Sequence, residues 1–389
     1  MKKINAVIFG ATGSIGKSTL SIISKYQNLI NLEGITCNSN LDKLIEIAKK
    51  YKVKKIGFNE NSIKKEIKHN LNEFEIFNDL SNFNKIISKK TDIIIYAISG
   101  LVSLNLLLIL LKSGKKIGIA NKECIITLGQ TFNLLSKKYN TEIIPLDSEH
   151  NSIYHLLRQD FGKHKSITIT ASGGPFVHFN QKRLQKVTLT EALKHPIWKM
   201  GKKISIDSST LMNKILELVE AQKLFNISYN KLDILIHPES LVHAIIEFKN
   251  GLVKFMYHDT SMIIPLANAI FDGKINIENF YKNKKVKFKD KITKNLNFDK
   301  VNNDIFPLIK LKNKILEFPS SPIIINAANE ILVDHFLNKK LQFLRINKII
   351  MSVLNDRNYK KYAIRKPKNI NHIIEIDKWA RETAKKYVL

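Results

Sequence analysis

Short apolar runs rich in β-branched residues alternate with helix-type patterns along the first 150 residues. Strands that are apolar along their whole length are buried on both faces, so this alternation predicts a parallel sheet covered by helices. The expected strands are Ile4–Phe9, Leu32–Thr36, Lys54–Phe58, Ile93–Ile98, Lys116–Ala120 and Glu142–Pro145, and the expected helices are Gly16–Tyr26, Asp42–Tyr51 and Leu101–Leu111. We therefore predict an α/β chain whose residues 1–150 form a Rossmann-like domain.

The pattern changes after residue 150. Residues 151–273 predict a second, mixed α/β domain, 274–300 a linker rich in Lys and Asn, and 301–389 a small helical domain. In the second domain we expect a helix ending over His155–Gln159, a strand Ser166–Ala171, a helix Asp207–Leu224, a strand Ile234–Ile236 and a hairpin of His243–Phe248 with Gly251–Met256. The helical patterns of the last domain are Phe306–Leu311, Ile323–Asn338, Ile346–Asn355 and Asp377–Tyr387.

The chain is strongly basic, with 63 Lys and Arg against 34 Asp and Glu and a formal charge of +29. Such a charge attracts nucleic acid, membrane surfaces or phosphorylated metabolites. The lysines are spread along the whole chain, and no basic run carries the interleaved aromatics of a nucleic-acid surface. We therefore expect a phosphorylated small molecule, and neither nucleic acid nor a membrane, as the partner.

Two cysteines in 389 residues cannot form a disulfide framework, which favours a reducing compartment. The uncharged stretch Ile93–Leu111 is long enough to suggest a membrane span. Ser99, Gly100 and Asn105 interrupt it, so a buried strand followed by a buried helix is the better interpretation. We expect a cytoplasmic protein.

A glycine-rich turn, Gly10–Gly16, lies between the first strand and the first helix. Its spacing, G-x-x-G-x-x-G, is a variant of the dinucleotide fingerprint, in which the backbone approaches a pyrophosphate at the helix N-terminus. A purely structural tight turn is the alternative. The second strand is followed by Cys37-Asn38-Ser39-Asn40, where an NAD-binding protein usually carries a carboxylate. This absence favours NADPH over NADH, although an ordinary polar turn is also compatible with it.

Asp147 and Glu149 stand two residues apart where a strand is expected to end. A period of two would aim both carboxylates the same way, as a site for Mg²⁺ or Mn²⁺ requires. Carboxylates exposed on a surface loop are the alternative.

A second polar cluster occupies Asp207–Glu217, where Asp207 or a nearby serine is expected to cap the helix. Asn213 and Lys214 precede Glu217 by four and three residues, so the three share one helix face. A solvated salt bridge is one interpretation. The other is a phosphate site made by Ser208, Asn213 and Lys214, with Glu217 available to a metal.

Three further segments carry candidate groups. The strand-to-loop turn Ala171–Phe176 places Ser172 among small residues that could admit an anion. The segment His195–Gly201 combines His, Trp and Met in a loop and predicts a lid over a ligand, although a structural histidine beside proline is also common. Asn121-Lys122-Glu123 adds a cation after a strand, at the edge where open α/β sheets bind ligands.

Taken together and in this order, the motifs closely resemble those of the 1-deoxy-D-xylulose 5-phosphate (DXP) reductoisomerase family. The motifs are GATGSIG at 10–16, ANKE at 120–123, PLDSEHNSI at 145–153, ASGGPF at 171–176, HPIWKMGKKISIDSSTLMNKILE at 195–217, HPES at 237–240 and NAANE at 326–330. The resemblance spans nearly the whole chain. It implies an NADP-dependent oxidoreductase and isomerase of the non-mevalonate (MEP) route of isoprene biosynthesis, acting with Mg²⁺ or Mn²⁺ as a homodimer.

The resemblance also assigns roles residue by residue. It implies a catalytic domain over 151–273 that carries the metal and substrate site and the lid loop, with the carboxylates Asp147, Glu149 and Glu217 holding the metal and Lys122 aiding catalysis. The implied cofactor residues are Thr12, Gly13, Ser14, Ile15, Asn38, Ser39, Asn40, Asn121, Glu123 and Gly201. The implied substrate residues are Lys122, Ser148, Glu149, Ser172, His195, Trp198, Ser208, Asn213, Lys214 and Glu217, with His243 matching a further active-site histidine.

The chain departs from the family pattern at two places. Asn38-Ser39 stands where the family often has Gly followed by Lys, Arg or Ser, so a weaker grip on the 2′-phosphate is expected. The segment 257–265 keeps Met262 and Pro265 of the family's Gly-x-Pro-Asp-Met-Arg-x-Pro but lacks its arginine. All positions implied for the metal and the phosphate are intact.

The implied reaction isomerises DXP to a branched aldehyde and reduces it with NADPH to 2-C-methyl-D-erythritol 4-phosphate. A plain NADPH-dependent sugar-phosphate dehydrogenase is the alternative enzyme, and simple hydride transfer would not need three carboxylates on one metal. A nucleotide-sensing or nucleic-acid-binding Rossmann protein is the alternative outside enzymes. It would need no such carboxylates, and its affinity for DNA would fall steeply with salt.

Ser39→Asp should lower or reverse the expected preference for NADPH. A carboxylate at this position repels a 2′-phosphate and accepts a hydrogen bond from a 2′-hydroxyl. The measurement is kcat/KM for NADPH and for NADH in both proteins, and an unchanged ratio would show that Ser39 does not lie at the ribose.

Overall fold

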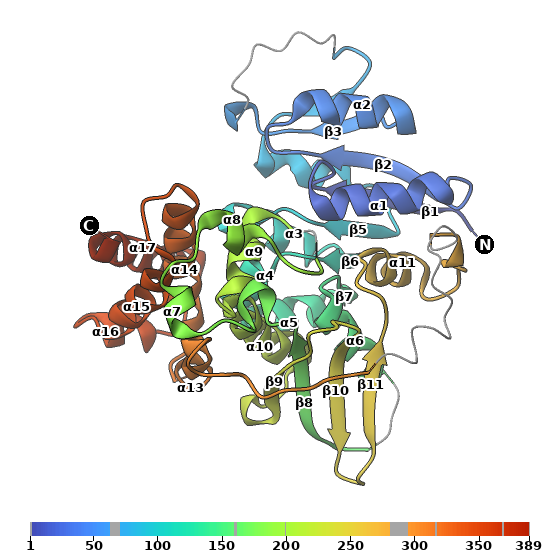
Figure 1. The fold of residues 1–389 in the computed structure, drawn as a ribbon. Coiled ribbons are helices and arrows are strands. Elements are labelled where there is room, and N and C mark those ends of the chain that lie inside the picture. The colour runs from blue at the N-terminus through green and yellow to red at the C-terminus, as the bar shows by residue number, and fades with distance from the viewer. Residues whose placement is uncertain are drawn as a thin grey trace. The chain divides into compact units, whose positions relative to one another are not determined.

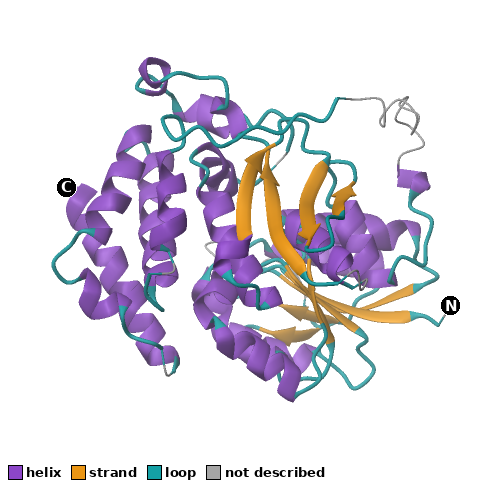
Figure 2. Ribbon diagram, turned by 90° about the horizontal axis from the view of Figure 1, so that it is seen from below, coloured by secondary structure: helices purple, strands orange, loops and turns teal. Residues whose placement is uncertain are grey.

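The computed structural model describes residues 2–62, 71–158, 162–198, 200–280, 295–315, 317–367 and 369–388. The chain divides into two compact units. The first contains residues 1–154 and 261–294, and the second contains 155–260 and 295–389. Both units mix helices with strands, as Figure 2 shows.

The first unit is built on a seven-stranded sheet in the order β4-β3-β2-β1-β5-β6-β7. Every neighbouring pair is parallel, which confirms the predicted doubly covered parallel sheet. The strands are β1 Ile4–Phe9, β2 Ile30–Thr36, β3 Lys55–Gly57, β4 Glu75–Phe77, β5 Ile93–Tyr96, β6 Lys116–Ile119 and β7 Ile143–Pro145. β4 was not predicted, because its three residues, of which one is buried, form no apolar run.

Helices follow the strands of this unit in the order that a parallel sheet requires. They are α1 Ser14–Lys25, α2 Leu41–Tyr51, α3 Leu104–Leu110, α4 Lys122–Leu128, α5 Gln130–Lys138, α6 Ser148–Leu157 and α11 Ile263–Phe271, with 3₁₀ turns at Glu60–Ser62, Leu80–Ile86, Leu101–Ser103 and Glu278–Phe280. The apolar helix α11 packs against α1, which explains why this late segment belongs to the first unit (Figure 1).

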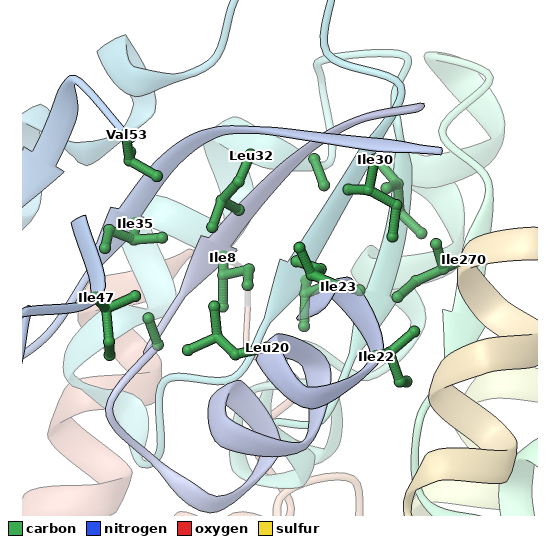
Figure 3. Close-up of a cluster of buried hydrophobic side chains, with 14 of the residues drawn as sticks. Ile8, Leu20, Ile22, Ile23, Ile30, Leu32, Ile35, Ile47, Val53 and Ile270 are labelled. Carbon is green, nitrogen blue, oxygen red and sulfur yellow. The ribbon is translucent and has the colours of Figure 1, made fainter. Parts of the chain in front are cut away.

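A layer of buried aliphatic side chains joins α1, α2 and α11 to the sheet (Figure 3). Ile8 and Ile35 come from neighbouring strands, Leu20 and Ile23 from α1, and Ile270 from α11. All five are at most 6% exposed. Each fully buried Leu or Ile contributes roughly 1.5–3 kcal/mol, so this layer fixes α1 rigidly behind the glycine-rich turn.

The second unit contains a four-stranded sheet in the order β11-β10-β8-β9. The strands are β8 His164–Ala171, β9 Leu232–Ile236, β10 Val242–Phe248 and β11 Val253–Tyr257. β8 and β9 are parallel, whereas β10 is antiparallel to both β8 and β11. The mixed sheet and the β10–β11 hairpin confirm the prediction.

The helices of this unit fall into two groups. Between β8 and β9 lie α7 Gln181–Leu184, α8 Leu189–Leu193, α9 Lys202–Ser209 and α10 Met212–Phe225, with 3₁₀ turns at Gly174–Phe176 and Tyr229–Lys231. The C-terminal group comprises a 3₁₀ turn Pro307–Lys310, α13 Leu311–Lys314, α14 Ser321–Leu337, α15 Phe343–Leu354, α16 Tyr359–Ala363 and α17 Ile370–Val388. α14 packs against both α15 and α17, and the predicted helical C-terminal region is confirmed (Figure 1).

The prediction of one helix over Asp207–Leu224 is wrong. α9 ends at Ser209 and α10 begins at Met212, because Leu211 adopts a left-handed conformation with φ of 66°. The Thr210 hydroxyl donates to the Ile206 carbonyl at 3.2 Å and accepts from the Met212 amide at 3.4 Å, which stabilises the break. Residues 205–207 and 209–212 are buried on both sides of this point, so the pattern of buried residues continues across the break, and no glycine or proline marks it.

Two further predictions concern the course of the chain. The stretch Ile93–Leu111 forms β5, a 3₁₀ turn and α3, as expected. Within the described ranges, no helix combines the length and apolarity needed to cross a bilayer. Gln159 and most of the predicted linker, residues 281–294, lie outside the described ranges, and the division into three domains and a linker stays a prediction.

Gly16→Ala should destabilise the first unit, whereas Gly13→Ala should leave its stability almost unchanged. A Cβ on Gly16 would lie 2.4 Å from the Gly10 carbonyl oxygen and 2.5 Å from that of Ala11. A Cβ on Gly13 would meet the Gly10 oxygen at 3.4 Å, an ordinary contact. Overpacking of this kind costs about 1–3 kcal/mol, so thermal denaturation should show a loss of several degrees for Gly16→Ala. Equal melting temperatures for the two variants would contradict the close approach.

Candidate active site

The residues singled out in the sequence fall on both units, and each unit carries its own set. The first unit holds the glycine-rich turn, the turn after β2, and the carboxyl ends of β6 and β7. The second unit holds Ser172, the segment from His195 to Gly201, the α9–α10 region and His243.

The glycine-rich turn joins β1 to α1 with a tightly bonded backbone. Gly10, with φ of 92°, donates to the Thr36 hydroxyl at 3.1 Å, and the Ala11 amide donates to the Thr36 carbonyl at 2.7 Å. α1 begins at Ser14 without a side-chain cap. The first turn of a helix leaves backbone N–H groups without helical partners, so this end of α1 suits an anionic group.

The polar turn after β2 is exposed over Asn38, Ser39 and Asn40. The Asn40 side chain caps α2 by accepting from the Lys43 amide at 3.2 Å. Ser39 and Asn38 therefore offer a hydroxyl and an amide to solvent at the carboxyl end of the strand, where a ribose would lie. Burial raises the pKa of the neighbouring Cys37 to about 12, so this thiol is not a nucleophile.

Asn121 organises the end of β6. Its side-chain oxygen accepts from the Cys124 amide at 2.7 Å, and its amide nitrogen donates to the Ile98 carbonyl at 2.5 Å and the Gly100 carbonyl at 2.9 Å. The buried side chain thus caps α4 and ties it to the loop after β5. Lys122, the first residue of α4, is held with its ammonium 3.7 Å from the Asp147 carboxylate.

The expected period-two placement of Asp147 and Glu149 is wrong. β7 ends at Pro145 and α6 begins at Ser148, so Glu149 lies in the first helical turn. The Asp147 carboxylate accepts from the Glu149 amide at 3.3 Å, and the Ser148 hydroxyl donates to the Glu149 carboxylate at 2.6 Å. The two carboxylates are therefore presented by a helix start, which itself favours negative charge.

In the second unit, Glu217 is only 1% exposed and is bonded to two neighbours on α10. Asn213 donates to one carboxylate oxygen, and the Lys214 ammonium donates to the other at 2.7 Å. This confirms that the three side chains share one face of α10. The ion pair is buried rather than solvated, so it differs from the surface salt bridge that was the simpler interpretation.

Ser208 lies in the last turn of α9, and the buried Asp207 beside it does not cap α10, contrary to the prediction. The Asp207 carboxylate accepts from the Asn329 side chain at 2.7 Å and lies 3.1 Å from the Lys203 ammonium. A Cβ on Gly174 would lie 3.0 Å from the Ser208 carbonyl oxygen, so the Ser172 loop packs directly against this end of α9.

Ser172 and His195 form a second hydrogen-bonded pair in this unit. His195 Nδ1 accepts from the backbone amides of Ile197 at 3.2 Å and Trp198 at 2.9 Å. Nδ1 therefore carries no proton, and Nε2–H donates to the Ser172 hydroxyl, 3.0 Å away. The same hydroxyl accepts from the Gly174 amide at 3.1 Å, which directs its own hydrogen towards another acceptor.

The segment predicted to be a lid has neither helix nor strand from Lys194 to Met200 among the described residues, and Lys199 is outside them. Trp198 lies edge-on to His243 of β10, with ring centroids 6.1 Å apart. The exposed Gly201 follows and precedes α9 in extended backbone conformation.

Two contributors were missed in the sequence. His150, fully buried, has Nδ1 3.2 Å from the Asp147 carboxylate. The i,i+3 spacing of Asp147 and His150 would have shown this neighbour if the start of the helix ending over His155–Gln159 had been predicted. Asn329, in the NAANE motif, reaches Asp207 across 122 residues, and no local signal predicts that contact.

Comparison with known proteins gives matches along almost the whole chain. Residues 6–129 match the model of 1-deoxy-D-xylulose 5-phosphate reductoisomerase, and residues 143–225 and 259–383 match two models of its C-terminal domains. The DXP reductoisomerase of Pelagibacter ubique is 42% identical over 386 residues, which cover 96% of each chain. That of Thermoanaerobacter pseudethanolicus is 36% identical, with both chains covered in full. The chain belongs to the DXP reductoisomerase family.

Solved structures of reductoisomerases are similar in fold. A reductoisomerase crystallised with NADPH, fosmidomycin and magnesium has a TM-score of 0.88 at 29% identity, with 99% of this chain and 98% of that one covered. The enzyme from Zymomonas mobilis in complex with NADPH has a TM-score of 0.85 at 30% identity, with coverage of 100% and 99%. These similarities confirm the predicted α/β class and the family assignment.

The donor groups of this reductoisomerase suit a hard divalent cation. Asp147, Glu149 and Glu217 all offer carboxylate oxygens, the ligands that Mg²⁺ and Mn²⁺ prefer. A carboxylate buried as deeply as Glu217 needs positive charge nearby, which Lys214 supplies in this structure.

His195 should remain neutral down to about pH 4. Burial, and secondarily the nearby Lys214, lowers the pKa of His195 from about 6.5 to about 4. Between about pH 6.5 and pH 4, His195 is protonated in the unfolded chain but neutral in the folded chain. The free energy of unfolding therefore falls as the pH is lowered through this range. Part of this fall should disappear in His195→Gln. Ring NMR shifts of His195 measure its titration directly, and a midpoint near 6.5 would show that burial does not hold this imidazole neutral.

Proposed function

We propose that this protein converts DXP to 2-C-methyl-D-erythritol 4-phosphate, using NADPH and a divalent cation, in isoprenoid precursor synthesis. The observation that carries the proposal is the 42% identity to a DXP reductoisomerase over 96% of both chains. Similar solved reductoisomerases contain NADPH, magnesium and the inhibitor fosmidomycin.

NADPH would bind to the first unit along the carboxyl ends of its strands. Gly13, Ser14 and Ile15, with Thr12, would receive the pyrophosphate at the start of α1, and Asn38, Ser39 and Asn40 the 2′-phosphate. Gly201 and Glu123 would lie towards the nicotinamide. Because every polar atom of the Asn121 side chain is already bonded within the unit, we assign Asn121 to positioning Lys122 and Glu123.

Asp147, Glu149 and Glu217 would hold the cation, which when bound polarises the ketone and hydroxyl oxygens of the substrate. Glu217 already shares both carboxylate oxygens with Asn213 and Lys214. Metal ligation would take over part of this carboxylate, and the released amide and ammonium groups would turn to the substrate phosphate. Lys122, close to Asp147, would transfer a proton or stabilise an oxyanion.

The substrate phosphate would lie between Ser172, Ser208, Asn213 and Lys214. His195 orients the Ser172 hydroxyl, because its Nε2–H occupies one lone pair of that oxygen. Ser148 would contact the carbon skeleton beside the metal, and Trp198 would cover it. A plain sugar-phosphate dehydrogenase would leave the three carboxylates without a role, and the family membership does not favour it.

NADPH oxidation with DXP as substrate, measured with and without EDTA, tests this function. We expect turnover that EDTA abolishes and Mg²⁺ or Mn²⁺ restores, with 2-C-methyl-D-erythritol 4-phosphate identified by NMR. Metal-independent oxidation, or an unbranched sugar alcohol as product, would refute the proposal and support the dehydrogenase.

We also propose a homodimer located in the cytoplasm. β11 is an edge strand whose hairpin exposes Leu252, Val253 and Phe255, each at least 51% exposed, so a second copy has an apolar edge to pair with. Phe255→Lys should then yield monomers in light scattering, whereas a monomeric wild type would refute the dimer. Cys37 and Cys124 are buried and form no disulfide, which suits a reducing compartment, and fractionation of source cells tests the location.

Lys214→Ala should weaken DXP binding more than Ser208→Ala. A charge-assisted hydrogen bond is about twice as strong as a neutral one, and Lys214 contributes the only cation among the four proposed phosphate ligands. Fosmidomycin should lose affinity in parallel, whereas Mn²⁺ should bind no more weakly, because Glu217 loses a competitor. The measurement is titration calorimetry with each ligand, with the exposed Lys249→Ala as a matched loss of charge. Wild-type affinity of Lys214→Ala for both phosphorus ligands would show that Lys214 is only the partner of Glu217.

A further inference from the structure

The residue after β11 is a histidine at a position where the family pattern has glycine. Counting back from Pro265 along Gly-x-Pro-Asp-Met-Arg-x-Pro places His258 at the first position of the pattern. An imidazole thus occupies a place where the family pattern carries no side chain.

His258 stacks on His243. Their ring centroids lie 3.7 Å apart with an angle of 13° between the planes. Trp198 meets His243 edge-on, at 6.1 Å and 75°. The three rings belong to the second unit and come from three segments: β10, the residue after β11, and the loop before α9. They form a column with His243 in the middle.

Hydrogen bonds hold His258 and His243 of this column in place. The His258 amide donates to the Leu241 carbonyl at 2.9 Å, so its backbone is anchored beside β10. His243 Nε2 lies 3.2 Å from the His258 carbonyl, and His258 Nδ1 lies 2.8 Å from the Asp259 carbonyl. A carbonyl only accepts, so both of these ring nitrogens carry hydrogens. His258 therefore holds His243 at its face and at one edge.

The His258 ring is neutral at neutral pH, because burial lowers its pKa, outweighing the nearby Asp259. The stack therefore forms on an uncharged ring face.

We propose that His258 is a positioning residue that holds His243, and through it Trp198, in place for the substrate. The proposal deepens the proposed function and rests on it for the identity of the substrate. If Trp198 is already held in place, ordering the loop before α9 over the substrate costs less free energy. Loss of the His258 ring should therefore raise KM and leave kcat unchanged.

Two variants separate the stacked ring from the backbone around it. His258→Ala removes the ring, whereas His258→Phe keeps an aromatic face over His243 and loses the hydrogen bond to Asp259. The chain has two tryptophans, so Trp379→Phe leaves Trp198 as the sole emitter. Trp379 stacks on Tyr362 in the C-terminal helices, and phenylalanine preserves an aromatic ring there.

In the Trp379→Phe background without ligands, His258→Ala should lower the fluorescence anisotropy of Trp198, and His258→Phe should keep it. In turnover assays of DXP, His258→Ala should raise KM about threefold to tenfold, the range expected for a lost aromatic pair, with kcat and NADPH affinity unchanged. His372→Ala removes an imidazole from α17 and serves as the matched control. It should change neither the anisotropy of Trp198 nor KM. Thermal denaturation of each variant establishes that it is folded.

Wild-type anisotropy and KM in folded His258→Ala would overturn the proposal. Equal losses in His258→Ala and His258→Phe would also overturn it, because the ring face would then not be the holding element. If the parent protein does not turn over DXP, the proposed function fails, and the anisotropy of the two variants still decides whether His258 holds Trp198.

Discussion

The buried carboxylate of Glu217 must be paired, and this requirement constrains the fold of the second unit. Burying an unpaired carboxylate costs several kcal/mol, so the fold must supply donors to it. Asn213 and Lys214, on the same helix face, supply both. Asp207 is buried under the same constraint and is satisfied by Lys203 and Asn329. Through Asn329, α14 of the C-terminal region supports the helix that carries Ser208, so this region takes part in shaping the site.

The first unit depends on a different constraint, the common direction of its strands. Parallel strands bring their carboxyl ends to one edge, and four of the seven strands are followed there by groups that can bind a ligand. The turn after β1 offers backbone N–H groups, the turn after β2 a hydroxyl, the turn after β6 an ammonium and the turn after β7 two carboxylates. The Asn121 side chain accepts a hydrogen bond from the first turn of α4, and the Asp147 side chain accepts one from the first turn of α6. Each residue therefore ends a strand-to-helix connection and fixes the direction of the polar side chains that follow it.

What could be predicted from the sequence follows from the range of the interactions involved. The parallel sheet, the hairpin and the shared face of Asn213, Lys214 and Glu217 depend on local periodicity, and all are confirmed. β4 was missed because it is too short to show a period, and the start of α6 because a polar helix start resembles a loop. The contacts of Asn329 with Asp207 and of His258 with His243 depend on tertiary packing, which no spacing in one sequence reveals. The roles of individual site residues came from the resemblance rather than from pattern.

The break between α9 and α10 shows why such a local error matters for function. In a continuous helix each residue turns about 100°, so Ser208 and Asn213, five positions apart, would point about 140° away from each other. They could not then serve one phosphate. Because Leu211 is left-handed, Ser208 lies at the end of α9 and Asn213 at the start of α10. The directions of these two side chains are therefore not set by a single helix. The strained residue is buried and its hydroxyl neighbour Thr210 bonds across the turn, so packing stabilises a conformation that leucine rarely adopts. A shared phosphate site for these two residues therefore requires the break that the sequence pattern concealed.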